Sequence, residues 1–151
     1  MVDQKYTMIG MQRNPKNACA CLAVRKAARA ITQFYDSYIQ SFGLKPTQHS
    51  LLLAVYVADG VTISGLAHFM VMDRTTLTRN LKPLEKEGLL TVKPGLDKRT
   101  KKIIITRKGV NLLKKMTPAW ESAQQELNQC IGNEKFGSLL KDMADIVEAI
   151  H

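Results

Sequence analysis

The sequence predicts a mainly helical protein of one domain that contains a single small β-hairpin. Apolar residues recur at steps of three and four over most of the chain, which is typical of amphipathic helices. After Gly88 the pattern changes to two short β-branched runs that flank a turn sequence, which indicates a hairpin. A chain of 151 residues can bury one core and is short for two ordinary domains.

The chain is expected to begin with a flexible arm over residues 1–16, where polar groups mix with isolated Met and Ile around Pro15. Asn17 is suited to cap a first helix, because its side-chain oxygen can accept from free backbone N–H groups. Apolar positions from Leu22 to Ile39 recur at helical spacing, and Gly43 supplies a stop. We therefore expect a helix within residues 17–43.

The second and third helices are expected to be short. Pro46 fits the first turn of a helix over PTQHSLLLAVYVA, because its missing N–H has no partner there in any case. This helix should end at Asp59-Gly60. The β-branched VTI follows, and Ser64 is expected to cap a third helix over GLAHFMV.

A fourth helix is expected from Arg74 to Glu87. Asp73 is its expected cap, and Gly88 should end it. Leu77, Leu81 and Leu84 share one face and should point inward. Two short helices joined by a tight connection, the second richly polar, form a helix-turn-helix.

The last third of the chain predicts a hairpin and two further helices. LLTVKP and KKIIIT read as strands around GLDKRT, in which Gly95 and Asp97 suit a turn. A long helix is expected from about Thr106 to Cys130, interrupted at TPAW, where Pro118 should kink it or Thr117 should restart it. The apolar stripe of the last helix is formed by Phe136, Leu139, Leu140, Met143, Ile146, Val147 and Ile150.

The positive charge of the chain is concentrated in one segment. Of the net charge of +9, eight lie in residues 74–108, which contain eleven basic and three acidic side chains. The basic ones are Arg74, Arg79, Lys82, Lys86, Lys93, Lys98, Arg99, Lys101, Lys102, Arg107 and Lys108; the acids are Glu85, Glu87 and Asp97. Such a local positive field attracts a polyanion, the alternative being an ordinary solvated surface.

Composition also excludes several classes of protein. No apolar run is long enough to span a bilayer or to form a signal-peptide core, so we expect no membrane partner and a cytoplasmic location. The odd number of cysteines argues against a self-contained disulfide framework. The sequence has no Cys-x-x-Cys, no supported Ser/His/Asp constellation, no Gly-rich phosphate loop and no zinc-ligand spacing. We therefore expect no enzymatic activity, no metal and no cofactor.

Three stretches carry a resemblance to a known family: LKPTQHSLLLAV, ISGLAHFMVMDRTTLTRNLKPLEKEGLL and GLDKRTKKIIITRKGVNLL. With the order of elements, they resemble the MarR (multiple antibiotic resistance regulator) family of winged helix-turn-helix transcription factors over nearly the whole chain. The helix ending LEKEGL, the Asp97-x-Arg99 of the wing and the following ITRKG are the specific part of this match. The chain departs from the family pattern at Lys45, where a capping hydroxyl is usual, and at His49, where an aromatic residue is common.

The resemblance implies a homodimer with two kinds of region. Residues 17–43 and 106–151 correspond to the helices that intertwine in the family dimer, and residues 46–105 to the winged helix-turn-helix lobe that binds DNA. The apolar stripe of the last helix independently favours a partner surface, although such a stripe also suits an intramolecular core. Two lobes related by a two-fold axis imply a pseudo-palindromic operator with half-sites about one helical turn apart.

The fourth helix is expected to lie in the major groove, where arginine can bind guanine and threonine can contact a base, a thymine methyl or a phosphate. The resemblance places Arg99 in the adjacent minor groove, oriented by Asp97, while the lysines of the wing contact phosphates. The expected DNA contacts are Ser64, Arg74, Thr75, Thr76, Thr78, Arg79, Lys82, Lys98, Arg99, Lys101 and Lys102.

Members of the family commonly respond to small aromatic ligands or to oxidants. Tyr35, Tyr38, His49 and Trp120 are the candidate ligand contacts, and ordinary core aromatics are the alternative. Cys19 and Cys21 point to different faces of a helix and cannot easily pair with each other. We expect either small buried cysteines or an oxidation switch, in which Cys19 or Cys21 pairs with Cys130 of a second subunit.

These observations predict a dimeric, sequence-specific DNA-binding transcriptional regulator, expected to be a repressor released by a small ligand or an oxidant. A winged-helix module that binds DNA without sequence choice, or that mediates protein interactions, is the alternative. Specificity separates the two, because phosphate contacts alone cannot discriminate between sequences.

Overall fold

The structure, a computed structural model, describes residues 19–95 and 100–151. In chain order its elements are α2 (Ala20–Ile39), the 3-10 turn η2 (Gln40–Phe42), α3 (Pro46–Ala58), α4 (Ile63–Phe69), α5 (Arg74–Lys86), β1 (Leu90–Pro94), β2 (Lys101–Ile105), α6 (Arg107–Ile131) and α7 (Asn133–Ile150). The predicted fold class, mainly helical with one β-hairpin, is confirmed. The arm expected over residues 1–16, and Asn17, lie outside the described residues.

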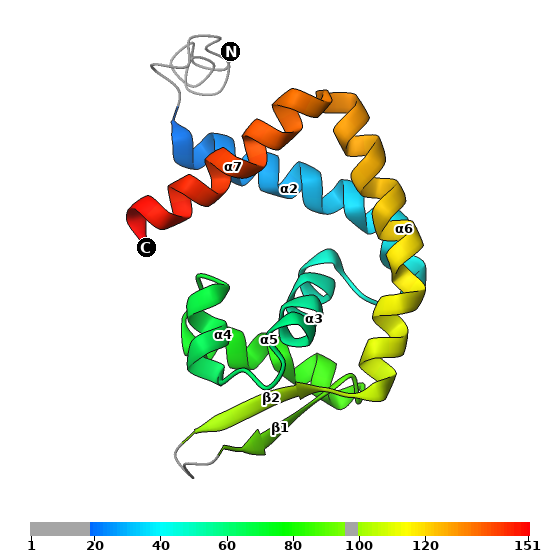
Figure 1. Cartoon of the computed structure of the whole chain (residues 1–151), viewed down its shortest axis with the longest axis vertical. Coiled ribbons are helices and arrows are strands. Elements are labelled where there is room, and N and C mark those ends of the chain that lie inside the picture. Colours follow the sequence, from blue (N-terminus) through cyan, green and yellow to red (C-terminus); the bar gives the residue numbers. More distant parts are fainter. Residues whose placement is uncertain (1–18, 96–99) are drawn as a thin grey trace, which may run out of the picture.

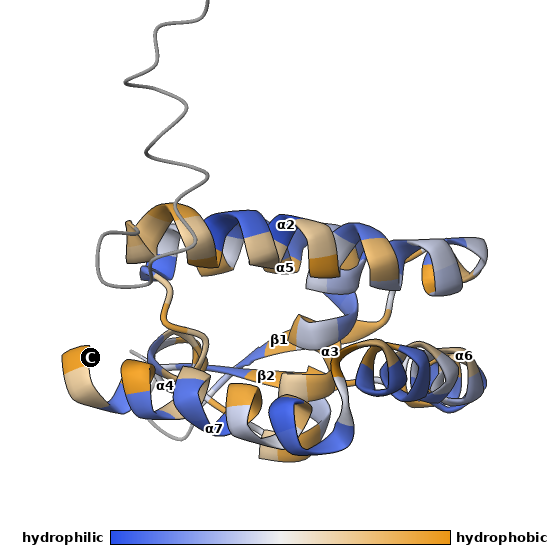
Figure 2. Ribbon diagram, turned by 90° about the horizontal axis from the view of Figure 1, so that it is seen from above, coloured by the Kyte–Doolittle hydropathy of each residue, from blue (hydrophilic) through white to orange (hydrophobic). Residues whose placement is uncertain are grey.

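The elements form a lobe and an arch. Figure 1 shows α3, α4, α5 and the hairpin gathered at one end of the molecule, with α2, α6 and α7 around the other. Helix α6 starts at the base of the hairpin and contacts α2, α3 and α7. Seen from above, α2 and α7 lie on opposite sides of the molecule (Figure 2). The lobe and the arch are therefore joined mainly through α6 and α3.

One apolar core holds the lobe together. Leu52, Leu66, Leu77, Leu84 and Leu90 are each fully buried, and they come from every helix of the lobe and from its first strand. The same cluster continues to Ile39 of α2 and Met116 of α6. Burial of a leucine contributes about 1.5–3 kcal/mol. The core therefore fixes both the helix-turn-helix and its seat on the arch.

The two strands of the hairpin pair as the sequence predicts, and the segment before α4 pairs with β2 as well. Strands β1 and β2 are antiparallel, with Val92 opposite Ile103 and Lys93 opposite Lys102. A bridge joins Thr62 to Lys102, and the N–H of Ile103 donates to the carbonyl of Val61 at 2.8 Å. The β-branched segment before α4 thus holds the wing against the helix-turn-helix.

Two details of the sequence prediction are wrong. Thr62, and not Ser64, caps α4: the Thr62 hydroxyl accepts from the N–H of Gly65 at 3.0 Å, and the helix begins at Ile63. Both residues carry a hydroxyl that can cap a helix. Thr62 is the cap because the pairing of residues 61–62 with β2 keeps its backbone in the extended conformation that the N-cap position requires. Helix α6 also runs unbroken through TPAW, with Pro118 in its interior, and follows a curved path in Figure 1. Thr117 donates its hydroxyl proton to the carbonyl of Leu113 and does not restart the helix.

A close backbone contact fastens the end of α5 to the start of α6. Gly88 ends α5 in the left-handed conformation, at φ 69°. The N–H of Thr106 donates to the carbonyl of Leu89 at 3.0 Å, while the Thr106 hydroxyl donates to the carbonyl of Gly88 at 2.7 Å. The same hydroxyl oxygen accepts from the N–H of Gly109 at 3.1 Å, which caps α6. A Cβ on Gly109 would lie 2.2 Å from the Leu89 oxygen.

We expect Gly109→Ala to destabilise the protein by about 1–3 kcal/mol, because the added methyl group meets backbone that cannot move without breaking the Thr106 contacts. Urea unfolding of the variant measures this change. Asn111→Ala, at an exposed position two residues further along α6, is the matched control and should change stability by less than about 0.5 kcal/mol. Equal stability of the two variants would contradict the close contact.

Candidate nucleic-acid interface

The start of α5 is organised by Asp73. One carboxylate oxygen accepts from the N–H of Thr76 at 2.8 Å and the other from the Thr76 hydroxyl at 2.6 Å. These hydrogen bonds, the side-chain one first, hold the pKa of Asp73 below its usual value. The predicted cap is therefore confirmed, and a charged carboxylate satisfies N–H groups at the positive end of the helix.

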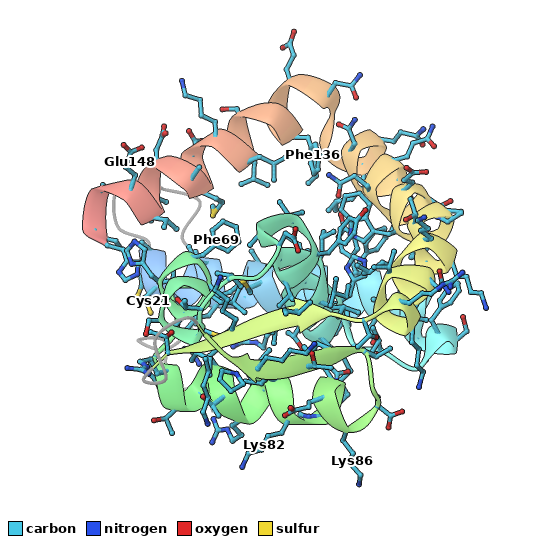
Figure 3. All side chains as sticks on the ribbon, turned by 60° about the horizontal axis from the view of Figure 1, so that its bottom comes forward. Cys21, Phe69, Lys82, Lys86, Phe136 and Glu148 are labelled. Carbon is cyan, nitrogen blue, oxygen red and sulfur yellow. The ribbon has the colours of Figure 1, made fainter. Side chains whose placement is uncertain are left out.

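Three buried leucines fix the rotation of α5. Leu77, Leu81 and Leu84 are 0–2% exposed and pack in the core of the lobe. The opposite side of the helix then carries one polar stripe at steps of four, three and four: Thr75, Arg79, Lys82 and Lys86, all exposed. Figure 3 shows Lys82 and Lys86 pointing away from the body of the protein. Lys86 was not among the contacts expected from sequence. Its spacing of four residues from Lys82 is the signal that places both on the same stripe.

The hydroxyl protons of two expected contacts are used within the helix. Thr76 donates to Asp73, and Thr78 donates to the carbonyl of Arg74 at 2.7 Å. Each hydroxyl can still accept a hydrogen bond, and each methyl group can still make an apolar contact. Thr75 and Arg79 stand alone on the outward stripe within the first two turns of α5.

A hollow of about 430 Å³ brings further expected residues together. It is lined by Thr62, Ile63, Ser64, Arg74, Thr78, Thr100 and Lys101, which come from α4, α5 and the hairpin. Ser64 and Arg74 are exposed there. Lys102 is half-buried and lies in the strand pairing described above. The expected contacts Lys98 and Arg99 lie outside the described residues.

A second, separate site lies where α2, α3 and α6 meet. A pocket of about 210 Å³ is lined by Ile31, Thr32, Tyr35, Ile39, Pro46, Thr47, His49, Ser50 and Trp120. The His49 ring stacks on the Trp120 ring with centroids 6.3 Å apart, and Tyr35 lies at the same distance from Trp120. Burial lowers the pKa of His49, which favours the neutral imidazole. The structure thus assembles three of the four aromatic candidates around one pocket.

Tyr38 is the fourth candidate and does not line that pocket. Its ring packs against Phe34, and its hydroxyl donates to the Glu126 carboxylate on α6. This hydrogen bond first, and then burial, raises the pKa of Tyr38. Tyr35 makes a parallel contact to Gln124, and burial raises its pKa. The two tyrosines therefore join α2 to α6.

The cysteines lie at opposite ends of α2. Cys19 and Cys21 stand at its start, whereas Cys130 on α6 lies close enough to Tyr38, near the end of α2, to raise its pKa. All three thiols are free and exposed in the single chain, so the expectation of small buried cysteines is wrong there. Figure 3 shows Cys21 on the far side of the molecule from the arch of α6. Since α2 is about 30 Å long, a disulfide between its two ends requires a second chain.

Within residues 19–95 and 100–151, no group of three or more His, Cys, Asp or Glu side chains is arranged to hold a metal ion. Over the same residues, none of the helices has the length and apolar character that crossing a membrane requires.

Comparisons with known proteins agree on one family. The model of the MarR family matches residues 42–100. The transcriptional regulator SarZ of Staphylococcus epidermidis RP62A is 26% identical over 84% of this chain and 85% of its own. The crystal structure of the Mycobacterium tuberculosis transcriptional regulator MosR in complex with DNA has a TM-score of 0.79 and 37% identity, over 87% of this chain and 95% of that one. The Staphylococcus aureus MepR–DNA complex shares the fold, with a TM-score of 0.74. Its identity is 20%, over 88% of this chain and 98% of that one.

We expect the stability of the protein to fall as the pH drops below about 6.5, because the unfolded chain protonates His49 before the folded protein does. The loss should continue until the pH reaches the lowered pKa of the folded state. In His49→Gln this part of the pH dependence should disappear. Urea titrations between pH 7.5 and 5 measure it, with the exposed His151→Gln as control. Identical slopes for wild type and His49→Gln would contradict a buried neutral imidazole.

Proposed function

The chain belongs to the MarR family of DNA-binding transcriptional regulators, and we propose that it is a homodimeric repressor with a pseudo-palindromic operator. A small aromatic effector or an oxidant releases it from DNA in this proposal. The family consists of transcriptional regulators and not of enzymes. The observation that carries the proposal is the polar stripe of α5, which lies opposite three buried leucines in the most basic segment of the chain.

The polar stripe suits the DNA major groove, which is wide enough to admit a helix. Arg79 can bind the O6 and N7 atoms of guanine with two parallel hydrogen bonds, and Thr75 can offer its methyl group to thymine or its hydroxyl to a base edge. Lys82 and Lys86 lie one and two turns further along and are placed for phosphates. Arg99 of the wing is proposed for the adjacent minor groove.

The proposed dimer follows from apolar surface on the arch. Leu140, Met143, Ile146 and Val147 of α7 are exposed in the single chain, and Ile150 is 82% exposed. Figure 2 shows apolar residues along both α2 and α7, on opposite sides of the molecule. A second copy of the chain, placed by a two-fold axis, can cover both helices with the same two helices of its own.

The proposed effector site is the pocket around His49 and Trp120. Its walls come from α2 and α6 of the arch and from α3 of the lobe, so an occupant contacts both regions. Its volume, below that of typical drug-sized sites, and its aromatic wall suit a small aromatic compound. A ligand changes DNA affinity only if it binds the DNA-competent and incompetent arrangements unequally. The seam between arch and lobe is where such arrangements differ.

The proposed response to oxidants uses the exposed thiols. A disulfide between Cys19 or Cys21 of one subunit and Cys130 of the other would lock the two arches together. Non-reducing electrophoresis of the oxidised protein tests this part of the proposal: a covalent dimer that Cys130→Ser abolishes supports it. Oxidised wild-type protein that migrates only as a monomer on the non-reducing gel would contradict the proposed disulfide.

The test of sequence-specific binding is a titration of the protein against the duplex upstream of its own gene and a scrambled duplex of equal length. We expect Arg79→Ala to cost about 1–3 kcal/mol of discrimination, because its bonds to a base edge carry sequence information. Arg25→Ala, an exposed arginine on α2, is the matched control and should retain the preference. If both duplexes bind alike and are lost together as salt rises, the lobe is a non-specific electrostatic clamp instead.

The test of the dimer is sedimentation of Val147→Glu, which places a charge in the apolar stripe of α7. We expect this variant to sediment as a monomer where the wild type is a dimer, because burying an unpaired carboxylate in an interface is costly. Glu148→Gln, whose side chain points away from the body in Figure 3, should remain a dimer. A monomeric wild-type protein would refute the proposed assembly.

A further inference from the structure

A groove runs along one side of α5, between this helix and the wing. The hollow at Arg74 adjoins a second one of about 370 Å³, and the two share Ile63, Thr78 and Lys101 as lining residues. Along α5 the lining residues are Arg74, Thr78, Leu81, Lys82 and Glu85, which follow at helical steps. The groove therefore follows a second stripe of α5, adjacent to the stripe that carries Thr75 and Arg79.

The other wall of the groove is formed by the hairpin. Val92, Lys93, Pro94 and Lys101 line it, and Lys93 and Lys101 are exposed. Lys93 is not among the contacts expected from sequence. The strand register pairs it with Lys102 and puts its side chain on the face of the hairpin away from Val92 and the buried Ile103. Lys101 lies on the same face as Val92, which packs against the core of the lobe. Among the described residues, the basic ones placed to face the groove are therefore Arg74, Lys82 and Lys101.

Among the residues that the structure describes, Glu85 is the one acidic residue that lines either hollow. It lies seven residues after Thr78, in the last part of α5 and beyond the two turns that carry Thr75 and Arg79. It shares its wall of the groove with Lys82, and the opposite wall carries Lys101. Glu87, two residues further, lines neither hollow and is exposed on another side of the helix.

We propose that the groove seats the sugar-phosphate backbone of one DNA strand and that Glu85 weakens this contact. The inference rests on the proposed function, in which α5 occupies the major groove and the wing the adjacent minor groove. The backbone strand that separates two adjacent grooves must then pass between α5 and the wing, over the groove described here. Lys101 contacts a phosphate of this strand, and Glu85 faces the same strand with the opposite sign.

The position of Glu85 determines which property of DNA binding its charge affects. A carboxylate that faces the backbone repels every sequence alike, so it lowers affinity without changing the choice of sequence. Two unit charges about 6 Å apart in water interact by an energy that corresponds to about a threefold change in affinity at low salt, and salt screens the effect. Glu85 therefore keeps electrostatic binding weak, so that the base contacts of Arg79 and Thr75 make up more of the total affinity.

The experiment compares Glu85→Gln with Glu87→Gln on the upstream and the scrambled duplex, over a series of salt concentrations. We expect Glu85→Gln to bind both duplexes about threefold more tightly for each bound lobe at low salt, and to leave their affinity ratio unchanged. The slope of log affinity against log salt concentration should become steeper, by up to about one for each bound lobe. Glu87→Gln, the same charge change outside the groove, should have a smaller effect.

Lys101→Gln provides the reciprocal test and should weaken binding to both duplexes by a similar factor. Thermal melting of each variant confirms folding, which is expected to be normal because these side chains are exposed. Equal responses of Glu85→Gln and Glu87→Gln, or weaker binding of Glu85→Gln, would overturn this inference while leaving the proposed function intact. Failure of the wild-type protein to bind either duplex would contradict the proposed function itself.

Discussion

The burial of Leu77, Leu81 and Leu84 fixes the rotation of α5 about its axis, and the chemistry of its exposed sides depends on that rotation. Each leucine contributes about 1.5–3 kcal/mol through burial, so a turn of the helix that exposed them would forfeit most of the stability of a small domain. With the leucines held inside, Thr75 and Arg79 point outward, while Arg74 and Thr78 face the wing. One apolar stripe therefore defines two polar stripes with different proposed roles, base contact and backbone contact.

The lobe is joined to the arch at two places. At the first, Thr106 donates hydrogen bonds to the backbone of residues 88–89 and Gly109 packs closely against it, so the end of α5 follows the start of α6. At the second, the core continues from α3 to Ile39 and Met116, beside the pocket of His49 and Trp120. In the proposed mechanism an effector in this pocket acts on the angle between lobe and arch, and the rigid junction at Gly109 carries the change to α5. The spacing of the two recognition helices in a dimer would change with that angle.

Local rules of sequence predicted much of this fold. Asp73 as a cap, Pro46 in a first turn and Gly88 as a stop depend only on near neighbours along the chain, and each is found where expected. Ser64 failed as a cap because Thr62 also carries a hydroxyl and strand pairing decides between them. Thr117 failed as the start of a new helix because a helix anchored by packing on α2 and α3 continues through Pro118 and accepts one missing hydrogen bond.

The role of Glu85 in the groove was harder to predict, because the groove forms only in three dimensions. Glu85 and Lys101 belong to different elements, and the side of α5 that faces the wing is known only after the wing is placed against this helix. The exposure of the cysteines likewise depends on how α2 and α6 pack. Arg99, expected in the minor groove, lies outside the described residues.

In the proposed complex, α5 enters the major groove with the Thr75 and Arg79 stripe toward the bases. Protection from dimethyl sulfate tests it most directly, because this reagent methylates guanine at N7, on the floor of the major groove. We expect protected guanines in two clusters about one helical turn apart in the bound duplex, and we expect Arg79→Ala to lose the protection in each half. Tight binding that leaves every guanine N7 reactive would contradict it, since the protein would then be held without a helix in the major groove.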